Sequence, residues 1–195
     1  MARRSRAEMM EETRLKLMAT AREHFGTVGY AQTVMDDLTA KAGLTRGALY
    51  HHFGDKKGLF CAVLTQIDSE LDARLANVSA NAPDAWSAFT GRCHAYLKMA
   101  IEPEVQRILL RDASSVLDAD ELQSMRLDCL TSIADMLGGL MDEGTITPTS
   151  PDMLARLLNG GLMDMALWIA KSEDDEQALY QALSSLDVVL SGLKI

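Results

Sequence analysis

The stretch from Gln32 to Phe60, QTVMDDLTAKAGLTRGALYHHFGDKKGLF, most constrains how this chain can fold. Apolar residues recur there at helical spacing and predict a short amphipathic helix: Met35, Leu38 and Ala42. Thr33 is a suitable N-cap for it, Gly43 stands where a helix end favours a left-handed residue, and Thr45 can cap the next helix. Two short helices joined by a tight turn form a helix-turn-helix. Asp36 in the first turn could complete a shortened capping box.

The second helix of this motif, about Arg46 to His52, carries residues suited to DNA. Leu49 and Phe53, four residues apart, are expected to face the core. The outer face would then show arginine, threonine, tyrosine and histidine, with a glycine that permits close approach, and such a short helix suits a major groove. Asp55 can cap a third helix whose first turn holds Lys56 and Lys57. A DNA phosphate would supply the anion that favours these cations at a helix N-terminus, although both lysines could be ordinary solvated charges.

The run from Ala21 to Leu64 contains AREHFGTVGY, TVMDDLTAKAG, LTRGALYHHF and DKKGLF in that order, and it resembles the DNA-binding domain of the TetR family of bacterial transcriptional regulators. This resemblance implies an all-helical protein that works as a homodimer. It also implies DNA contacts, mostly to phosphates, by the residues that match the family's: Thr33, Thr45, Arg46, Gly47, Tyr50, His51, His52 and Lys56. The chain departs from the pattern at Thr39, and at Gly58, which is expected to weaken the first turn of the third helix.

Charge is distributed unevenly along the chain. Residues 1–58 hold ten Lys or Arg against seven Asp or Glu, a net +3, whereas residues 59–195 hold nine against twenty-one, a net −12. Positive charge therefore coincides with the helix-turn-helix. Arg3, Arg4 and Arg6 form a basic arm that is either a solubilising tail or a contact to phosphate or minor groove.

Composition agrees with an all-α fold of about nine helices. Residues 1–58 are expected to form the DNA-binding domain, and residues 59–195 a larger regulatory and dimerisation domain, with a long helix from Lys56 to about Ala80 reaching from one into the other. The stretch 77–83 is the expected linker. A run of ~18 apolar residues and a signal sequence are both lacking, so we expect a cytoplasmic protein with no membrane contact. The three scattered cysteines are more consistent with buried thiols than with a disulfide or zinc.

The central helices are where a small-molecule pocket is expected, because methionine adapts its shape to irregular cavities and the chain has twelve methionines. The candidate ligand-binding residues are Trp86, Phe89, Cys93, Tyr96, Met125, Cys129, Met136 and Trp168. The alternative is that these residues form an ordinary core. The segment PEVQRILLRDASSVL also resembles the regulatory domain of one subset of the same family, and a single helix is expected from Pro103 to about Leu117.

The last two helices are apolar on more than one face. A helix with two apolar faces needs two partners, which suggests a two-fold four-helix bundle between subunits. The candidate dimerisation residues are Leu154, Leu158, Leu162, Met165, Leu179, Leu183, Leu186 and Leu190. The alternative is that both helices are buried within a monomer.

These features favour a ligand-responsive, homodimeric regulator, more consistent with a repressor than an activator, whose partners are a double-stranded, pseudo-palindromic DNA operator and an unidentified small-molecule effector. The alternative is a DNA-binding regulator without a ligand, controlled by a protein partner. An enzyme is disfavoured because the sequence has no GxSxG, HExxH or glycine-rich phosphate loop. We expect no cofactor and no metal.

Overall fold

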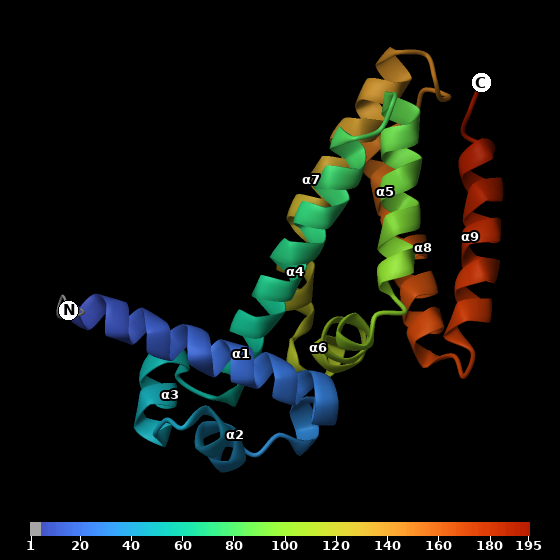
Figure 1. Cartoon of the computed structure of the whole chain (residues 1–195). Helices are drawn as coiled ribbons and strands as arrows, with labels where there is room; N and C mark the ends of the chain where they lie inside the picture. Colours follow the sequence, from blue (N-terminus) through green and yellow to red (C-terminus); the bar gives the residue numbers. More distant parts are fainter. Residues whose placement is uncertain (1–4) are drawn as a thin grey trace.

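The computed structural model describes residues 5–195, except for the side chain of Arg126. This part of the chain is all-α, as predicted, with nine α-helices, one π-helical segment and a single isolated β-bridge (Figure 1). The elements are α1 (Arg6–Gln32), α2 (Met35–Ala42), α3 (Arg46–Phe53), α4 (Lys56–Ala80), α5 (Ala85–Met99), η1 (Val105–Asp112), α6 (Ala113–Val116), α7 (Ala119–Asp142), α8 (Pro151–Lys171) and α9 (Asp175–Ser191). Arg3 and Arg4 of the basic arm lie outside the described residues, and Arg6 begins α1.

The N-terminal part packs α2 and α3 beneath α1, and α4 leaves it toward the rest of the molecule (Figure 1). Phe25, Tyr30 and Phe60 form an aromatic cluster, with ring centroids 5.0 to 6.0 Å apart. Leucines of α1, α2 and α3 complete this small core: Leu17, Leu38 and Leu49. These contacts fix the angle at which α2 and α3 are presented.

The first helix bends sharply at Gly29 and continues to Gln32. Gly29 has a positive φ of 83°, and a Cβ built there would lie 2.1 Å from Nη2 of Arg107. Glycine is therefore required both by the backbone and by the arginine that fills this space. Arg107 uses Nη2 to donate to the Val28 carbonyl at 2.8 Å.

The remaining helices form the body, in which α4 and α5 run antiparallel and α7 and α8 pack together (Figure 1). The expected linker is shorter than predicted, because α4 extends to Ala80 and only 81–84 connect it to α5. The expected domain boundary at residue 58 falls within the first turn of α4, so one uninterrupted helix belongs to both parts. Among the described helices, none is both long and apolar enough to span a bilayer.

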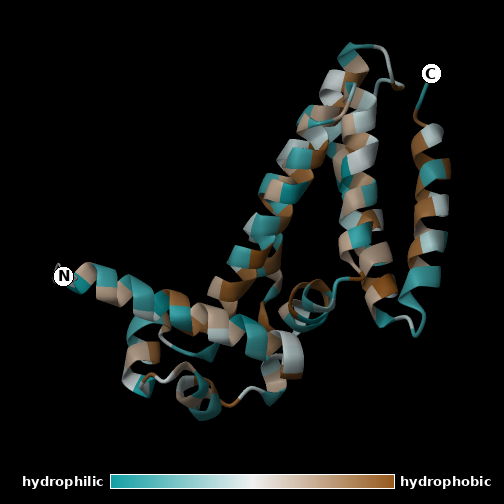
Figure 2. Ribbon diagram, viewed as in Figure 1, coloured by the Kyte–Doolittle hydropathy of each residue, from teal (hydrophilic) through white to brown (hydrophobic). Residues whose placement is uncertain are grey.

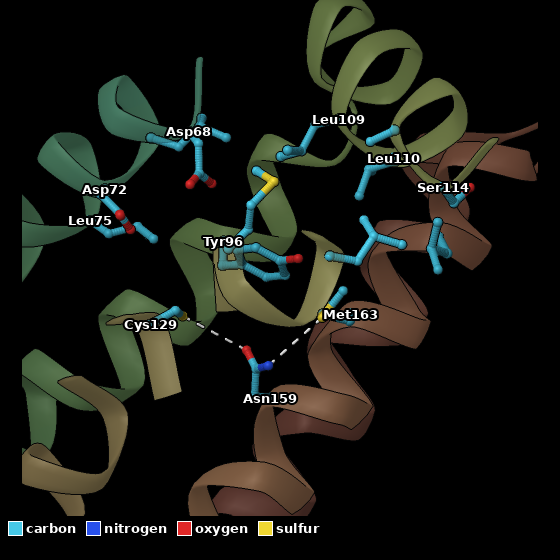
Figure 3. A pocket seen from close by; sticks show the side chains of 15 residues that line it. Asp68, Asp72, Leu75, Tyr96, Leu109, Leu110, Ser114, Cys129, Asn159 and Met163 are labelled. Carbon is cyan, nitrogen blue, oxygen red and sulfur yellow. Dashed lines mark hydrogen bonds between the residues drawn. The ribbon is translucent and has the colours of Figure 1, made fainter. Parts of the chain in front are cut away.

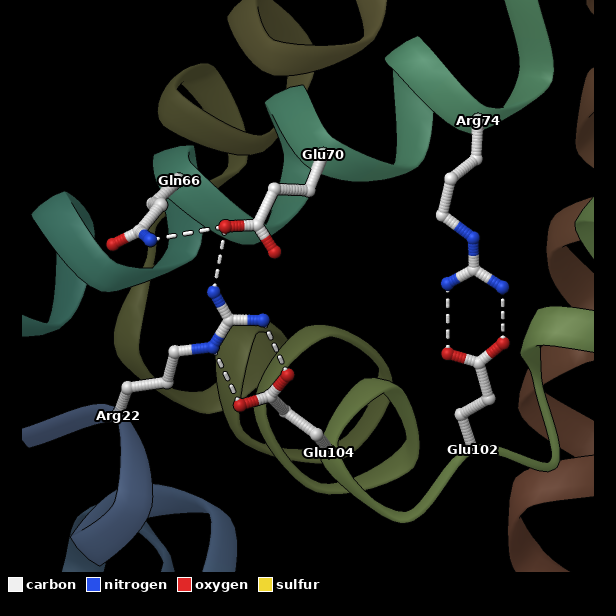
Figure 4. A network of polar contacts seen from close by, with 6 residues as sticks. All are labelled: Arg22, Gln66, Glu70, Arg74, Glu102 and Glu104. Carbon is white, nitrogen blue, oxygen red and sulfur yellow. Dashed lines mark hydrogen bonds and ion pairs between the residues drawn. The ribbon is translucent and has the colours of Figure 1, made fainter. Parts of the chain in front are cut away.

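The segment after α5 is not the single α-helix expected from Pro103 to Leu117. It is π-helical from Val105 to Asp112 and α-helical only from Ala113 to Val116. The Asp112 carboxylate accepts a hydrogen bond from the Tyr30 N–H of α1 at 2.7 Å. Arg22 of α1 binds Glu104, at the start of this segment, and Glu70 of α4 (Figure 4). The π-helical segment thus joins α1 to the body.

Candidate nucleic-acid interface and internal cavity

The turn between α2 and α3 has the predicted geometry. Gly43 ends α2 in the left-handed region, with φ 62° and ψ 35°, and its N–H donates to the Ala40 carbonyl at 3.0 Å. The Thr45 hydroxyl accepts from the Ala48 N–H at 3.2 Å and caps α3. Both predictions are confirmed, and only three residues, 43–45, join α2 to α3.

The predicted cap of α2 is wrong. Its N-cap is Val34, which has no side-chain hydrogen bond, and Thr33 instead donates its hydroxyl to the Gly29 carbonyl at 2.7 Å. Thr33 is only 4% exposed, and its hydrogen bond to Gly29 stabilises the bend at the end of α1. We therefore leave the Thr33 side chain out of the candidate DNA surface.

The outer face of α3 is exposed and polar, while Leu49 on the opposite face is buried. The predicted DNA-binding residues that the structure gathers on this exposed face are Thr45, Arg46, Gly47, Tyr50 and His51. His52 and Lys56 border the face and are half-buried. These seven of the eight predicted residues, five exposed and two half-buried, make up what we call the reading face.

Arg46 is held in place on the reading face by two neighbours. Its Nε and Nη1 lie 3.1 and 3.3 Å from the two carboxylate oxygens of Asp36 on α2. Its Nη2 donates to the Tyr50 hydroxyl at 3.3 Å, and the guanidinium lies 5.7 Å from the centre of the Tyr50 ring. Asp36 therefore orients Arg46 instead of completing a capping box.

The two lysines at the start of α4 point to different partners. The Lys56 ammonium lies 4.5 Å from the centre of the Tyr30 ring, and burial lowers the pKa of Lys56. Lys57 donates to Glu121 of α7 at 2.8 Å. Lys56 alone borders the reading face, and the anion beside Lys57 is supplied by the protein.

Gly58 has a packing role in addition to the one expected. Its N–H donates to the Asp55 carboxylate at 2.7 Å, which confirms Asp55 as the cap of α4. A Cβ at Gly58 would lie 2.0 Å from the Phe53 carbonyl oxygen. The glycine thus permits the close approach of α3 to α4, a role that the sequence did not indicate.

A cavity of about 140 Å³ lies within the body, lined by residues of α4, α5, η1, α6, α7 and α8 (Figure 3). Three predicted ligand-binding residues line it: Tyr96, Met125 and Cys129. The cavity also receives polar groups that sequence reasoning missed: Asp68, Asp72, Ser114 and Asn159. Asp68 and Asp72 could have been found as acidic residues directly beside the apolar stripe Ile67, Leu71 and Leu75 of α4.

The other five predicted ligand-binding residues lie elsewhere. Phe89 and Cys93 are buried in the core, and Met136 is half-buried outside the cavity wall. Trp86 lies beneath the Lys194 ammonium, 5.1 Å from the ring centre. Trp168 is on the surface of α8. These five side chains are of types that commonly line pockets, but they lie on helix faces that do not border the cavity.

Burial alters the titration of several cavity side chains. Burial, together with the charge of Asp72, raises the pKa of Asp68 to about 6. Burial also raises the pKa of the Cys129 thiol. Asp72 has a cation nearby, since Nη2 of Arg92 lies 4.0 Å from its carboxylate.

Comparison with protein families agrees with this geometry. The family model described as "Bacterial regulatory proteins, tetR family" matches residues 17–63, which contain the helix-turn-helix. The model described as "Tetracyclin repressor-like, C-terminal domain" matches residues 86–193, more than half of the chain. The chain belongs to the TetR family.

Individual proteins are similar to this chain over nearly its whole length or over its N-terminal part. A crystal structure of a TetR-family transcriptional regulator from Pectobacterium atrosepticum has a TM-score of 0.87 and 50% identity, and covers 98% of each chain. The transposon Tn10 TetC protein of Escherichia coli is 29% identical over 161 residues, 82% of this chain and 81% of TetC. The regulator SrpR of Pseudomonas putida is 40% identical over 72 residues, 37% of this chain and 33% of SrpR.

Membership of the TetR family confirms the resemblance found in the sequence. The protein is a DNA-binding transcriptional regulator, and members of this family are not enzymes.

The last two helices of this TetR-family chain use their two apolar faces differently. Four predicted dimerisation residues are buried in the core of the protomer: Leu158, Leu162, Leu186 and Leu190. The other four are half-buried at its margin: Leu154, Met165, Leu179 and Leu183. The exposed apolar side chains of these two helices lie outside that set of candidates: Met153, Leu157, Trp168, Tyr180, Val188 and Val189. Figure 2 shows hydrophobic residues recurring along α9 at the edge of the molecule.

Proposed function

We propose that this protein is a homodimeric, effector-responsive repressor that a small molecule releases from a pseudo-palindromic DNA operator. One observation carries the proposal: α4 connects the two candidate sites. Lys56, at its start, borders the reading face, and Asp68, Leu71, Asp72 and Leu75 on the same helix line the cavity. A ligand in the cavity would therefore contact a helix that packs against α3, which carries most of the reading face.

The reading face would enter a major groove. Arg46 is our choice for a base contact because arginine is the commonest reader of guanine, and the remaining reading-face residues would contact phosphates. In a dimer the two reading faces would meet half-sites about one helical turn apart, ~34 Å. Because it acts on the chromosome, such a regulator would work in the cytoplasm.

The exposed apolar side chains of α8 and α9 support a dimer. Met153, Leu157 and Trp168 recur at helical spacing on α8, and Tyr180 and Val188 do so on α9. Leu157 and Val188 are each 72% exposed in the protomer, which is costly for large aliphatic side chains unless a partner covers them. A second copy would cover both helices with the same two helices, in a two-fold four-helix bundle.

The cavity supports control by a small molecule over control by a protein partner. Its apolar wall with a few polar groups is typical of ligand sites. An effector needs only to bind the released state better than the DNA-bound state, and a coupling of ~1 to 3 kcal/mol is typical.

A fluorescence anisotropy titration against the DNA that flanks the protein's own gene tests the proposal. We expect saturable binding that weakens steeply as the salt concentration rises. Arg46→Ala should lose both affinity and base preference, whereas Lys98→Ala, which removes an exposed positive charge from α5, should bind like the wild type. Unchanged affinity and base preference in Arg46→Ala would disprove the assigned base contact.

A further inference from the structure

The cavity combines an apolar wall with two carboxylates from a single helix. Its wall is formed mainly by leucine, methionine and alanine: Leu71, Leu75, Leu109, Leu110, Ala113, Leu122, Met125, Met163 and Leu167. Asp68 and Asp72 are four residues apart on α4, so their side chains lie on the same side of the helix. Figure 3 shows both on the side of α4 that faces Tyr96. The cavity is therefore amphipathic, and its charge is negative.

The two carboxylates differ in their partners. Asp72 lies 4.0 Å from the Arg92 guanidinium. Asp68 has no described lysine, arginine or histidine within that distance, although it is largely screened from solvent. Its raised pKa, about 6, has burial as the main cause, with the charge of Asp72 adding to it. At neutral pH Asp68 is still mostly ionised, and a cation beside it would offset the cost of burying that charge.

A third polar group in the wall is weakly engaged. Asn159 of α8 accepts a hydrogen bond from the Cys129 thiol at 3.8 Å and donates one to the Met163 sulfur at 3.7 Å (Figure 3). Sulfur is a weak donor and a weak acceptor, so a nitrogen or oxygen of a ligand would be a better partner for this amide.

We propose that the cavity binds a small amphipathic organic cation, whose ammonium group pairs with Asp68 while its hydrocarbon or aromatic part lies against the leucine and methionine wall. This inference rests on the proposed function, in which the cavity is the effector site. An anionic ligand would instead meet the like charges of Asp68 and Asp72. A volume of about 140 Å³ suits a single aromatic ring or a short alkyl chain, because apolar cavities of ~150 Å³ accept benzene.

The cavity has room to extend past Met125. This residue also lines a neighbouring groove of about 300 Å³ between α4 and α7, formed with Cys61, Leu64, Thr65, Leu117, Glu121 and Ser124. Methionine has three flexible torsions, so we expect rotation of Met125 to connect the two spaces that it lines. Amines with longer tails would then also fit.

Calorimetric titration of the full-length protein with matched compounds tests the inference. The probes are phenethylamine, 2-phenylethanol and phenylacetate, and hexylamine, hexanol and hexanoate, which vary the charge at nearly constant shape. We expect the amines to bind at least ~10-fold more tightly than the alcohols, and the acids most weakly. Asp68→Asn should abolish the preference for amines and retain the binding of alcohols. Asp135→Asn, which neutralises an exposed carboxylate on α7, should keep the preference.

The pH dependence gives a second readout. Amine affinity should fall between pH 7.5 and pH 5 as Asp68 becomes protonated, whereas alcohol affinity should stay flat. Among the side chains that the structure describes, the other titratable or charged groups near Asp68 are Asp72 on α4, Arg92 and Tyr96 on α5, and Cys129 on α7. Asp68→Asn should flatten the amine profile as well.

Equal or tighter binding of the alcohols or acids, an amine preference that survives in Asp68→Asn, or no binding of any amine would each overturn the inference. Labelled operator in the same samples separates this failure from failure of the proposed function. If a neutral compound releases the operator and no amine binds, the proposed cation site is rejected, but the proposed function as an effector-responsive regulator stands. If amines bind but the operator stays bound, the cavity does bind cations, but it is not the effector site.

Discussion

Arg22 and Glu104 form a two-pronged ion pair between α1 and the start of η1. Arg22 Nε and Nη2 donate to the two Glu104 carboxylate oxygens at 2.7 and 2.6 Å. Arg22 Nη1 also donates to Glu70 of α4 at 2.7 Å. Because the guanidinium is planar and rigid, one side chain fixes α1 against two elements of the body at once. Lys57 and Glu121 form a second bridge, from α4 to α7.

Arg22→Met should loosen this junction. We expect a loss of about 1 kcal/mol of folding free energy, allowing for solvent screening, and a smaller effect of any effector on operator affinity. Arg22 lowers the pKa of Glu70. The stability that the Arg22–Glu70 pair contributes, and that the variant loses, should therefore be fully present above the ordinary Glu pKa of 4.5 and should vanish as the pH falls through the lowered pKa. Urea denaturation from pH 3 to 8 measures it. Lys41→Met, which breaks an exposed pair with Glu23 inside the N-terminal part, is the control. An equal effect of both variants on effector response would contradict a special role for Arg22.

Asp36→Asn should change how Arg46 meets DNA. The Asp36 carboxylate competes with DNA for the arginine and repels phosphates, but it also orients the guanidinium. We therefore expect tighter binding to unrelated DNA and poorer discrimination of the operator from it. Competition titrations with operator and scrambled DNA measure the ratio. Asp37→Asn, an exposed neighbour on α2, removes the same charge, and an identical change in both variants would show that Asp36 acts only through its charge.

Gly58→Ala should destabilise the protein by about 2 kcal/mol or more, because its Cβ would collide with the Phe53 carbonyl and force α3 away from α4. Gly26→Ala is the matched control, since it lies in α1 with no heavy atom within 4 Å of an added Cβ. That variant should gain roughly 0.5 to 1 kcal/mol from helix propensity. Thermal unfolding compares the two. A stable Gly58→Ala variant with normal operator binding would refute the close approach.

Asp68→Asn should stabilise the protein without ligand at pH 8. The folded-state pKa of Asp68, about 6, lies above its ordinary value of 3.8, so the folded state holds the proton more tightly. Wild-type stability should therefore fall as the pH rises from about 4 through 6, and the variant should lack that fall. After discounting for partial exposure, the difference should be roughly 1 kcal/mol at pH 8 and near zero at pH 4. Chemical denaturation at both pH values checks this, and parallel curves would contradict it.

Leu157→Arg should separate the subunits. The side chain is 72% exposed in the protomer, so the substitution should leave the protomer fold intact while placing a charge in the proposed interface. Light scattering should then report a monomer, and operator affinity should drop because only one reading face remains per particle. The control is Leu127→Arg, which changes another exposed leucine, on α7, outside the proposed interface. Dimers in both variants would exclude this surface.

The helix-turn-helix could be predicted in detail because its determinants are local. The left-handed Gly43, the Thr45 cap and the spacing of Leu38 and Leu49 each act within a few residues. Thr33 was misassigned because its hydroxyl reached back to Gly29, a bond that depends on a bend in α1. When a threonine near a helix end can reach two backbone partners, a carbonyl or an amide, the sequence alone does not show which of them its side chain binds.

The cavity could be predicted only in part, because it depends on how six elements meet. Tyr96, Met125 and Cys129 were found, but Trp168 lies on the opposite surface of α8. The same ambiguity affected the dimer surface. Hydrophobic spacing shows that α8 has two apolar faces, and it cannot tell which face meets the protomer's own core. Leu158 packs inside, while Leu157, one residue earlier, is exposed.

The unbroken course of α4 has a practical consequence for grafting. A chimera that takes its DNA-binding part from another regulator cannot be joined by a flexible splice at residue 58, because the cut would fall inside a helical turn. The fusion point must preserve helical phase, since each added or deleted residue rotates the donor part by about 100° relative to the body. A donor must also carry an arginine that reaches Glu104 and a glycine where Arg107 packs against Gly29. Compatible donors are thus defined by junction residues remote from the reading face.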